Sequence, residues 1–144
     1  MDNVGIVVND LKAAIAFFEE LGLTLQGETS VEGPWVDGVV GLEGTKSDVA
    51  FMQTPDGHSK IELTKYQEPG AIARESAELV NTLGAFRVMF TVSDLREVLT
   101  RLETHGAKLV KDVVEYGDAY RLCYVRGPEG IVIALAEPLK PENT

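Results

Sequence analysis

The sequence predicts an α+β fold made of two tandem βαβββ modules, whose curved mixed sheets enclose a cleft. Three observations predict it: an internal repeat of about half the chain, one apolar helical stripe in each half, and a tight-turn signal before the last strand of each half. A length of 144 residues suits a single domain that contains both halves.

The internal repeat consists of four blocks that keep their order along the chain. The spacing is constant within each block and shifts only in the loops between blocks, as expected for a duplicated module. The aligned pairs are residues 7–11 with 91–95, Gly22 with Gly106, residues 55–57 with 128–130, and residues 61–63 with 133–135.

The first half begins with a predicted strand over residues 3–8 and a predicted helix over residues 10–21. Apolar side chains recur along that helix at spacings of three and four residues, and Gly22 suits the left-handed residue that ends it. The turn Pro55-Asp56-Gly57 then separates the last two of three strands. The helical stripe consists of Leu11, Ile15, Phe18 and Leu21.

The second half repeats this order from a predicted strand over residues 87–92. Asp94, with Glu97 three residues later, resembles a capping box at a helix start, and Gly106 ends that helix. The helical stripe consists of Leu95, Val98, Leu99 and Leu102, and the last turn is formed by residues 127–130. We therefore predict modules over residues 1–66 and 85–138, a linker over 67–84 and a tail over 139–144.

Composition excludes several classes of protein. The formal net charge is −10, without a basic stripe, which argues against nucleic-acid binding. No apolar run approaches the ~20 residues of a membrane helix, and no signal peptide is visible, so we expect a cytoplasmic protein. The single Cys123 excludes an intrachain disulfide and, within an apolar strand, is interpreted as a small buried hydrophobe.

Strand alternation predicts which side chains line the cleft. The large apolar side chains of each strand should pack on the helices, which leaves the intervening residues on the opposite face. If the two sheets curl toward each other, that face forms a cleft lined by Asn3, Glu62, Arg87 and Ala134.

Paired βαβββ modules, the V-x-D-L helix entries at residues 8–11 and 92–95, and the P-D/E-G turns before I-x-L resemble the vicinal oxygen chelate superfamily. This superfamily includes glyoxalase I, bleomycin-resistance proteins and extradiol dioxygenases. The resemblance covers the chain from Asn3 to about Glu137 and implies the glyoxalase/bleomycin resistance/dioxygenase fold. Small glyoxalase-like bacterial proteins are the most similar branch.

Metal enzymes of that superfamily carry a ligand on the first and last strand of each module, typically His and Glu. The four positions fall here on Asn3, Glu62, Arg87 and Ala134, and only Glu62 matches. Asn is a poor ligand, Arg is always protonated, and Ala offers no donor. We therefore predict no cofactor, with a divalent metal (Ni, Zn, Mn or Fe) as the alternative.

Arg87 and Glu62 are the central pair of the predicted site. Arg presents a planar fork for a carboxylate or phosphate, so the pair is interpreted either as a ligand anchor or as a structural ion pair that fills the metal position. Two other features stay open. One is a two-ligand metal site formed by His58 and Glu62. The other is Trp35, which either covers the site or is a core or dimer-interface residue; it lies in a stretch after Gly33 and Pro34 that is expected to be irregular, and flexible at the later glycines. The predicted ligand-binding set is Arg87, Glu62, Asn3, Met89, Trp35, Phe51 and Tyr120, with Met52 and Tyr124 as further candidate walls.

Two functions follow from the resemblance. The first is a metal-independent protein that holds a small organic molecule, anionic or polar, in the cleft between modules. The second is a lyase, isomerase or dioxygenase-like enzyme acting on a carbonyl compound, with Glu62 as base or with a divalent metal. The resemblance also implies a homodimer.

Overall fold

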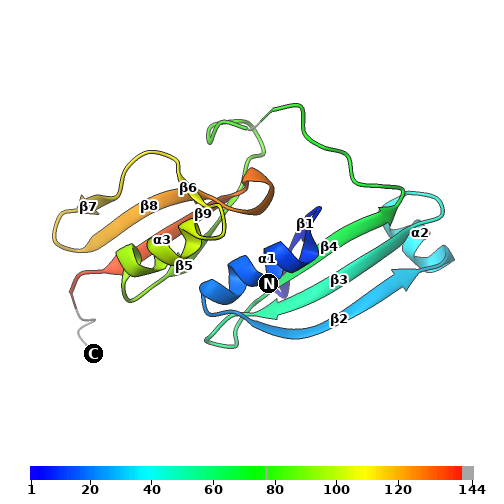
Figure 1. The fold of residues 1–144 in the computed structure, drawn as a ribbon, viewed down its shortest axis with the longest axis horizontal. Helices are drawn as coiled ribbons and strands as arrows, with labels where there is room; N and C mark the ends of the chain where they lie inside the picture. The colour runs from blue at the N-terminus through cyan, green and yellow to red at the C-terminus, as the bar shows by residue number, and fades with distance from the viewer. Residues whose placement is uncertain (77, 141–144) are drawn as a thin grey trace. The chain divides into compact units, whose positions relative to one another are not determined.

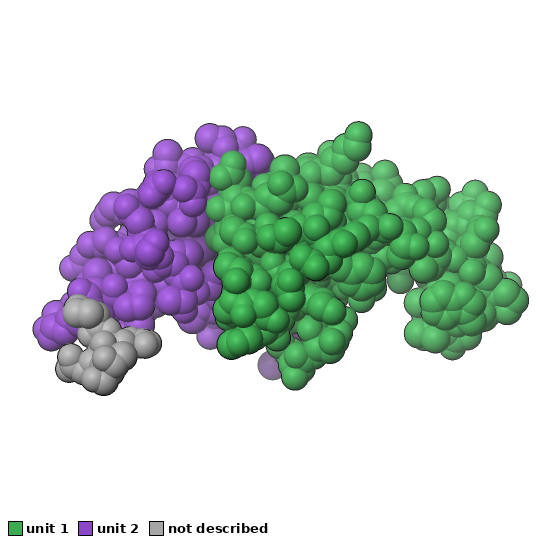
Figure 2. Space-filling model, turned by 90° about the horizontal axis from the view of Figure 1, so that it is seen from below, with its two compact units in different colours: residues 1–74 green, residues 75–144 purple. Residues whose placement is uncertain are grey.

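The computed structural model describes residues 1–76 and 78–140. These residues form two compact units, Met1–Arg74 and Glu75–Thr144 (Figure 2). The boundary falls inside the predicted linker of residues 67–84, of which the first two residues belong to a strand that ends at Glu68. The predicted tail lies outside the described residues from residue 141 onward.

The first unit contains a four-stranded mixed sheet in the order β1-β4-β3-β2 (Figure 1). β1 is parallel to β4, and the other neighbours are antiparallel. The elements are β1 (Asn3–Val7), α1 (Leu11–Glu20), β2 (Thr24–Glu32), α2 (Pro34–Val40), β3 (Lys46–Gln53) and β4 (Lys60–Glu68). The predicted strand, helix and three strands are all present.

The stretch around Trp35, expected to be irregular, is instead the short helix α2. Pro34 occupies its first turn, where a missing N–H costs nothing, and Gly41 ends it with a φ of 75°. The Asp37 carboxylate then accepts hydrogen bonds from the backbone N–H groups of Thr45 and Gly44, which hold its pKa below the ordinary value. Of the glycines that suggested flexibility, Gly38 therefore lies within the helix, Gly41 ends it and Gly44 lies in the loop behind it.

The second unit repeats the topology in the order β5-β9-β8, with β5 parallel to β9. Two short strands on the far edge of β8 take the place that β2 takes in the first sheet, so the strand predicted directly after the helix is broken in two. The elements are β5 (Arg87–Thr91), α3 (Leu95–Glu103), β6 (Lys108–Leu109), β7 (Val114–Tyr116), β8 (Tyr120–Arg126), the 3₁₀ turn Pro128–Gly130 and β9 (Val132–Pro138).

Both main helices begin and end as the sequence predicts. Asp10 accepts a hydrogen bond from the backbone N–H of Ala13, and Asp94 accepts one from that of Glu97. Gly22 and Gly106 follow the helices with φ of 91° and 87°. Each Asp satisfies one of the unpaired N–H groups of a first helical turn.

The core of each unit lies between one helix and one face of its sheet (Figure 1). In the first unit, Phe17 and Phe18 of α1 are buried and meet edge to face at 5.2 Å. In the second, the predicted stripe of α3 is buried over β9. The strand residues buried beneath the helices are Ile6, Met52, Ile61 and Leu63 in one unit and Val125, Ile133 and Leu135 in the other.

Candidate functional site

Each sheet has one face under its helix and an open face on the other side. Residues in cross-strand register share a face, and successive residues of a strand alternate between faces. Ile61 and Leu63 are buried under α1, whereas Glu62 between them is half-buried on the open face. In the second unit, Ile133 and Leu135 flank Ala134 on β9, and all three side chains are buried. Burial therefore separates the two faces at Glu62, as predicted, but not at Ala134.

On the open face of the first sheet, Glu62 lies in register with Gly5 on β1 and Phe51 on β3. Asn3 lies in register with Lys60, two residues before Glu62 on the same face, and its side-chain amide donates to Asp2 at 2.9 Å. No hydrogen bond or ion pair joins the Glu62 carboxylate to another described residue. This carboxylate is therefore available to a ligand or a reacting proton.

Gly5 adds open space beside Glu62, which the sequence reasoning did not identify. A Cβ placed on Gly5 would meet no atom within 4 Å. Glycine weakens a strand interior, so its presence in β1 is a sign of close approach by another group. That sign was visible in the sequence, but the neighbour of Gly5 required the register of β1 on β4.

On the open face of the second sheet, the Arg87 side chain lies over an aromatic ring. Its guanidinium carbon is 5.2 Å from the centroid of the Tyr124 ring, a cation–π distance. Tyr124 is in register with Ala134, which is in turn in register with Met89. Met89 is 53% exposed and Ala134 is buried. The Arg87 guanidinium therefore packs against the Tyr124 ring on a face that Arg126 and Thr91 also share.

Tyr120 shares this open face, because it lies four residues before Tyr124 on β8. Its side chain is exposed at the start of the strand, in register with Pro138. Asn3 and Glu62 belong to one unit, whereas Arg87 and Ala134 belong to the other. A single cleft lined by all four residues therefore stays a prediction.

The other residues predicted for the site lie in the core, on α2 and in a turn. Met52 is in register with Ile61 and fully buried under α1, so it is a core residue and not a wall of the site. Trp35 is 66% exposed on α2, which excludes a core role and leaves a ligand or subunit contact. His58 lies in the turn before β4, where its backbone N–H donates to the Asp56 carboxylate.

Cys123 is buried in β8, as the sequence predicts. Burial raises the pKa of its thiol to about 11, so the thiol is protonated at neutral pH. This side chain packs as a small hydrophobe and supplies no nucleophile.

The four positions that the resemblance assigns to a metal do not suit a divalent cation. Glu62 offers one carboxylate, Asn3 only an amide, Ala134 nothing, and Arg87 a permanent positive charge over Tyr124. A transition metal needs three or more protein ligands of the His, Cys or carboxylate type. In the part of the chain that is described, no three such side chains gather to hold a metal ion.

No described helix is long and apolar enough to cross a membrane. A sequence model of the Glyoxalase/Bleomycin resistance protein/Dioxygenase superfamily matches residues 1–135. The uncharacterised protein YwbC of Bacillus subtilis is 28% identical over 133 residues, which cover 90% of each chain.

Among solved structures, a glyoxalase family protein of Bacillus cereus is 54% identical, with a TM-score of 0.92 over 97% of this chain and 94% of that chain. The trypanothione-dependent glyoxalase I of Leishmania major is 20% identical, with a TM-score of 0.63 over 95% of this chain and 85% of that chain. The similarity to the Leishmania major enzyme, at 20% identity, shows a shared fold and no more.

Proposed function

Because the chain belongs to the Glyoxalase/Bleomycin resistance protein/Dioxygenase superfamily, we propose that it binds a small organic acid on the open faces of its sheets, without a divalent metal. Arg87 anchors the acidic group. Glu62 orients the ligand or accepts a hydrogen bond from it.

The observation that carries this proposal is the Arg87 guanidinium over the Tyr124 ring. Stacking leaves the edge of a planar fork free for two parallel hydrogen bonds to a carboxylate. Met89, on the same face and half exposed, supplies apolar area beside the charge. A cation held at a fixed place next to apolar surface is the usual composition of a small-molecule site.

Binding of benzoate, a planar carboxylate, tests the anchor by calorimetry. We expect Arg87→Gln to weaken benzoate binding by about tenfold or more, because it removes a charge-assisted bidentate contact. Arg87→Lys should recover part of the affinity, since it restores the charge and not the fork. Arg96→Gln, which removes an exposed charge on α3, is the matched control and should leave binding unchanged.

Metal content separates this proposal from a metalloprotein. The purified protein is incubated with Ni, Zn, Mn and Fe(II), freed of excess metal and measured by mass spectrometry. We expect well under one metal ion per chain. One tightly held ion per chain would overturn the proposal.

An enzymatic function is the second candidate, favoured by the Glu62 carboxylate beside the open space at Gly5. In this role Glu62 takes a proton from a carbon next to a carbonyl group, and Arg87 stabilises the resulting enolate. Glu62→Gln should then abolish turnover while ligand affinity stays within about tenfold. Unchanged turnover in Glu62→Gln would exclude Glu62 as the base.

We propose further that the protein is a cytoplasmic homodimer. The exposed apolar side chains of α2, Trp35 and Val39, support a subunit contact there. Sedimentation equilibrium tests the assembly. A monomer at micromolar concentration would contradict it, and Trp35→Ser should shift a dimer toward monomer.

A further inference from the structure

The open face of the second sheet has a basic end, and the rest of the face is uncharged. Residues in cross-strand register form rows across the face. The row at the basic end contains Arg87, Val132 and Arg126, and Lys108 is in register with Arg126. We call the rows that follow the uncharged strip. They consist of Met89, Ala134 and Tyr124, then Thr91, Ala136, Leu122 and Val114, then Pro138, Tyr120 and Tyr116.

The acidic residues of these strands, Glu115 and Glu137, lie on the other face of the sheet. Both are in register with Arg121, which donates hydrogen bonds to them at 2.9 and 3.0 Å. Glu137 also accepts the backbone N–H of Leu95 at the start of α3, so this row faces the helix. In a chain with a net charge of −10, the open face of this sheet therefore presents cations and no carboxylate from its strands.

The two arginines of the basic end keep charges that no carboxylate neutralises. The Arg87 guanidinium lies over the Tyr124 ring, and Arg126 donates to the backbone oxygens of Gly130 at 3.0 Å and Glu78 at 2.6 Å. Neither arginine forms a salt bridge with another described residue. An arginine is always protonated, so this end of the face attracts an anion.

The uncharged strip offers apolar surface for a chain of carbon atoms. Ala134 and Ala136 on the middle strand are buried, and larger side chains are in register with them on both neighbouring strands. Met89 is half exposed, Leu122 is half-buried, and a methionine adapts readily to the shape of a ligand. From Ala134 to Pro138 the strip extends for about 14 Å along the strand. This length exceeds what a compact acid needs.

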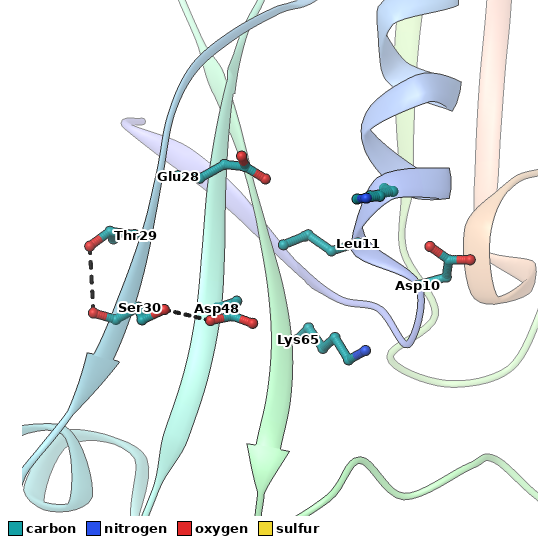
Figure 3. A pocket seen from close by; sticks show the side chains of 8 residues that line it. Asp10, Leu11, Glu28, Thr29, Ser30, Asp48 and Lys65 are labelled. Atoms are coloured by element: carbon teal, nitrogen blue, oxygen red, sulfur yellow. Dashed lines mark hydrogen bonds between the residues drawn. The ribbon is translucent and has the colours of Figure 1, made fainter.

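The pocket at the start of α1, on the helix side of the first sheet, has a different character (Figure 3). Its volume is about 570 Å³, and three carboxylates line it together with Lys12 and Lys65: those of Asp10, Glu28 and Asp48. Asp48 is in register with Lys65 and is attracted by the lysine charge. Because both signs of charge meet there, this pocket suits an apolar anion less well than the open face of the second sheet does.

This inference rests on the proposed function, which places an acid on Arg87. We propose that the acid is a medium-chain carboxylic acid, with its carboxylate on Arg87 and its alkyl chain along the uncharged strip. The orientation follows from the face itself, because cations stand only at the basic end. The chain passes over Ala136 and contacts Leu122, and the Arg126 charge adds to the attraction for the carboxylate.

A series of straight-chain acids tests this proposal by titration of the backbone amide spectrum. Butyrate, hexanoate and octanoate should all give saturable shifts at residues 120–124 and 134–136. Each added pair of CH₂ groups should tighten binding by about threefold or more, because each pair buries further apolar surface. Octylammonium, which has the octanoate chain length and the opposite charge, should give no saturable shift at these residues.

Leu122→Gln separates the chain from the carboxylate. It should weaken octanoate binding by about fivefold and leave butyrate binding unchanged, because the shorter chain does not reach this row. Val114→Gln, at an exposed position in register with Leu122, should weaken octanoate binding by a smaller factor and tests the strip even if Leu122→Gln does not fold. Leu25→Gln is the matched control, since it removes a partly exposed strand leucine of the first unit and should change neither affinity.

The outcomes distinguish this inference from the proposed function. If octanoate binds no tighter than butyrate while Arg87→Gln weakens both, the medium-chain ligand is overturned and the acid anchor stands. Equal shifts with octylammonium would also overturn the medium-chain acid. If Arg87→Gln binds both acids as well as the parent protein does, the proposed function is overturned together with this inference.

Discussion

The start of α1 and the start of α3 share the same backbone arrangement, but the charged side chains around the two helix starts have opposite signs. Each helix begins at an Asp cap followed by Leu, beside a parallel pair of strands in the same register. Around α3, Arg121 joins Glu115 at 2.9 Å and Glu137 at 3.0 Å. Around α1, the counterparts of Arg121 and Glu137 are Asp48 and Lys65, and a pocket remains.

This difference teaches that the side chains at a few register positions decide whether a carboxylate of the neighbouring strand covers a helix start or a pocket remains there. The second unit supplies its own carboxylate, and hydrogen bonding to Glu115 and then Glu137 raises the pKa of Arg121. The first unit has Lys65 there, in register with Asp48, and the lysine charge attracts that carboxylate without forming a salt bridge between the two described side chains. Duplicated modules can thus keep a fold and exchange the charges around a helix start.

The largest loss of stability is expected from removing the Glu137 carboxylate, which covers the start of α3. Glu137→Ala removes the acceptor for the Leu95 N–H and for Arg121, and its side chain is only 14% exposed. We expect a loss of about 2 kcal/mol in the free energy of unfolding, measured by urea denaturation. Lys65→Ala, at the equivalent place in the first unit, should change it by far less. Equal losses would contradict the comparison.

The two cores can be compared at another pair of equivalent positions, Ala50 and Cys123. Both are buried, and both lie in register with a leucine of the last strand. Ala50→Cys adds a sulfur atom to the buried face of the first sheet and should cost roughly 1–2 kcal/mol through overpacking. Cys123→Ala should cost less, because it removes a single heavy atom. Denaturant titration of the two variants measures both losses in the free energy of unfolding and checks which is larger.

Removing one helix cap should have a similar or slightly smaller effect. Asp10→Ala leaves the N–H of Ala13 without its acceptor and should cost about 1 kcal/mol. Asp10→Asn, which keeps an acceptor oxygen, serves as the control and should recover most of this loss. A result in which both variants lose the same amount would assign the effect to charge and not to the hydrogen bond.

The smallest change in stability is expected from Asp48, and this change depends on pH. Hydrogen bonds from Ser30 and then Gln67 lower its pKa from the ordinary value of 3.8. A lowered folded-state pKa gives stability that is present above the unfolded pKa and is lost as pH falls through the folded one. Asp48→Asn should therefore melt at a lower temperature than the parent protein at pH 7, and the two melting temperatures should converge as the pH falls through the lowered pKa of Asp48.

The repeat itself could be predicted from the sequence, and the strand registers now explain why. Ile6 pairs with Leu63 in one unit, and Phe90 pairs with Leu135 in the other, which matches the offsets of the aligned blocks. Helix α2 was not predicted, because seven residues with three valines after Pro-Trp are too short to show a recognisable helical period. The break between β6 and β7 was likewise invisible to a pattern of alternation.

The candidate site could likewise be predicted from the sequence only in part. Alternation placed Glu62 and Arg87 on the open faces, because the period of a strand fixes the side of every residue once the buried set is known. It could not reveal Gly5 beside Glu62 or Tyr124 beneath Arg87, since each contact depends on the register between strands. It also could not reveal the pocket of Lys12, Glu28 and Lys65, which α1, β2 and β4 form together.

The sequence by itself therefore determined the two modules, their helices and caps, and the face on which each strand residue lies. These features depend on neighbours within a few residues or on a period that the chain repeats. Only the tertiary structure decided which charges meet: Glu137 forms a salt bridge with Arg121 in one unit, and Lys65 lies in register with Asp48 in the other. Those contacts join residues 16 or more positions apart, and their geometry follows from strand pairing and helix packing, which no local pattern encodes.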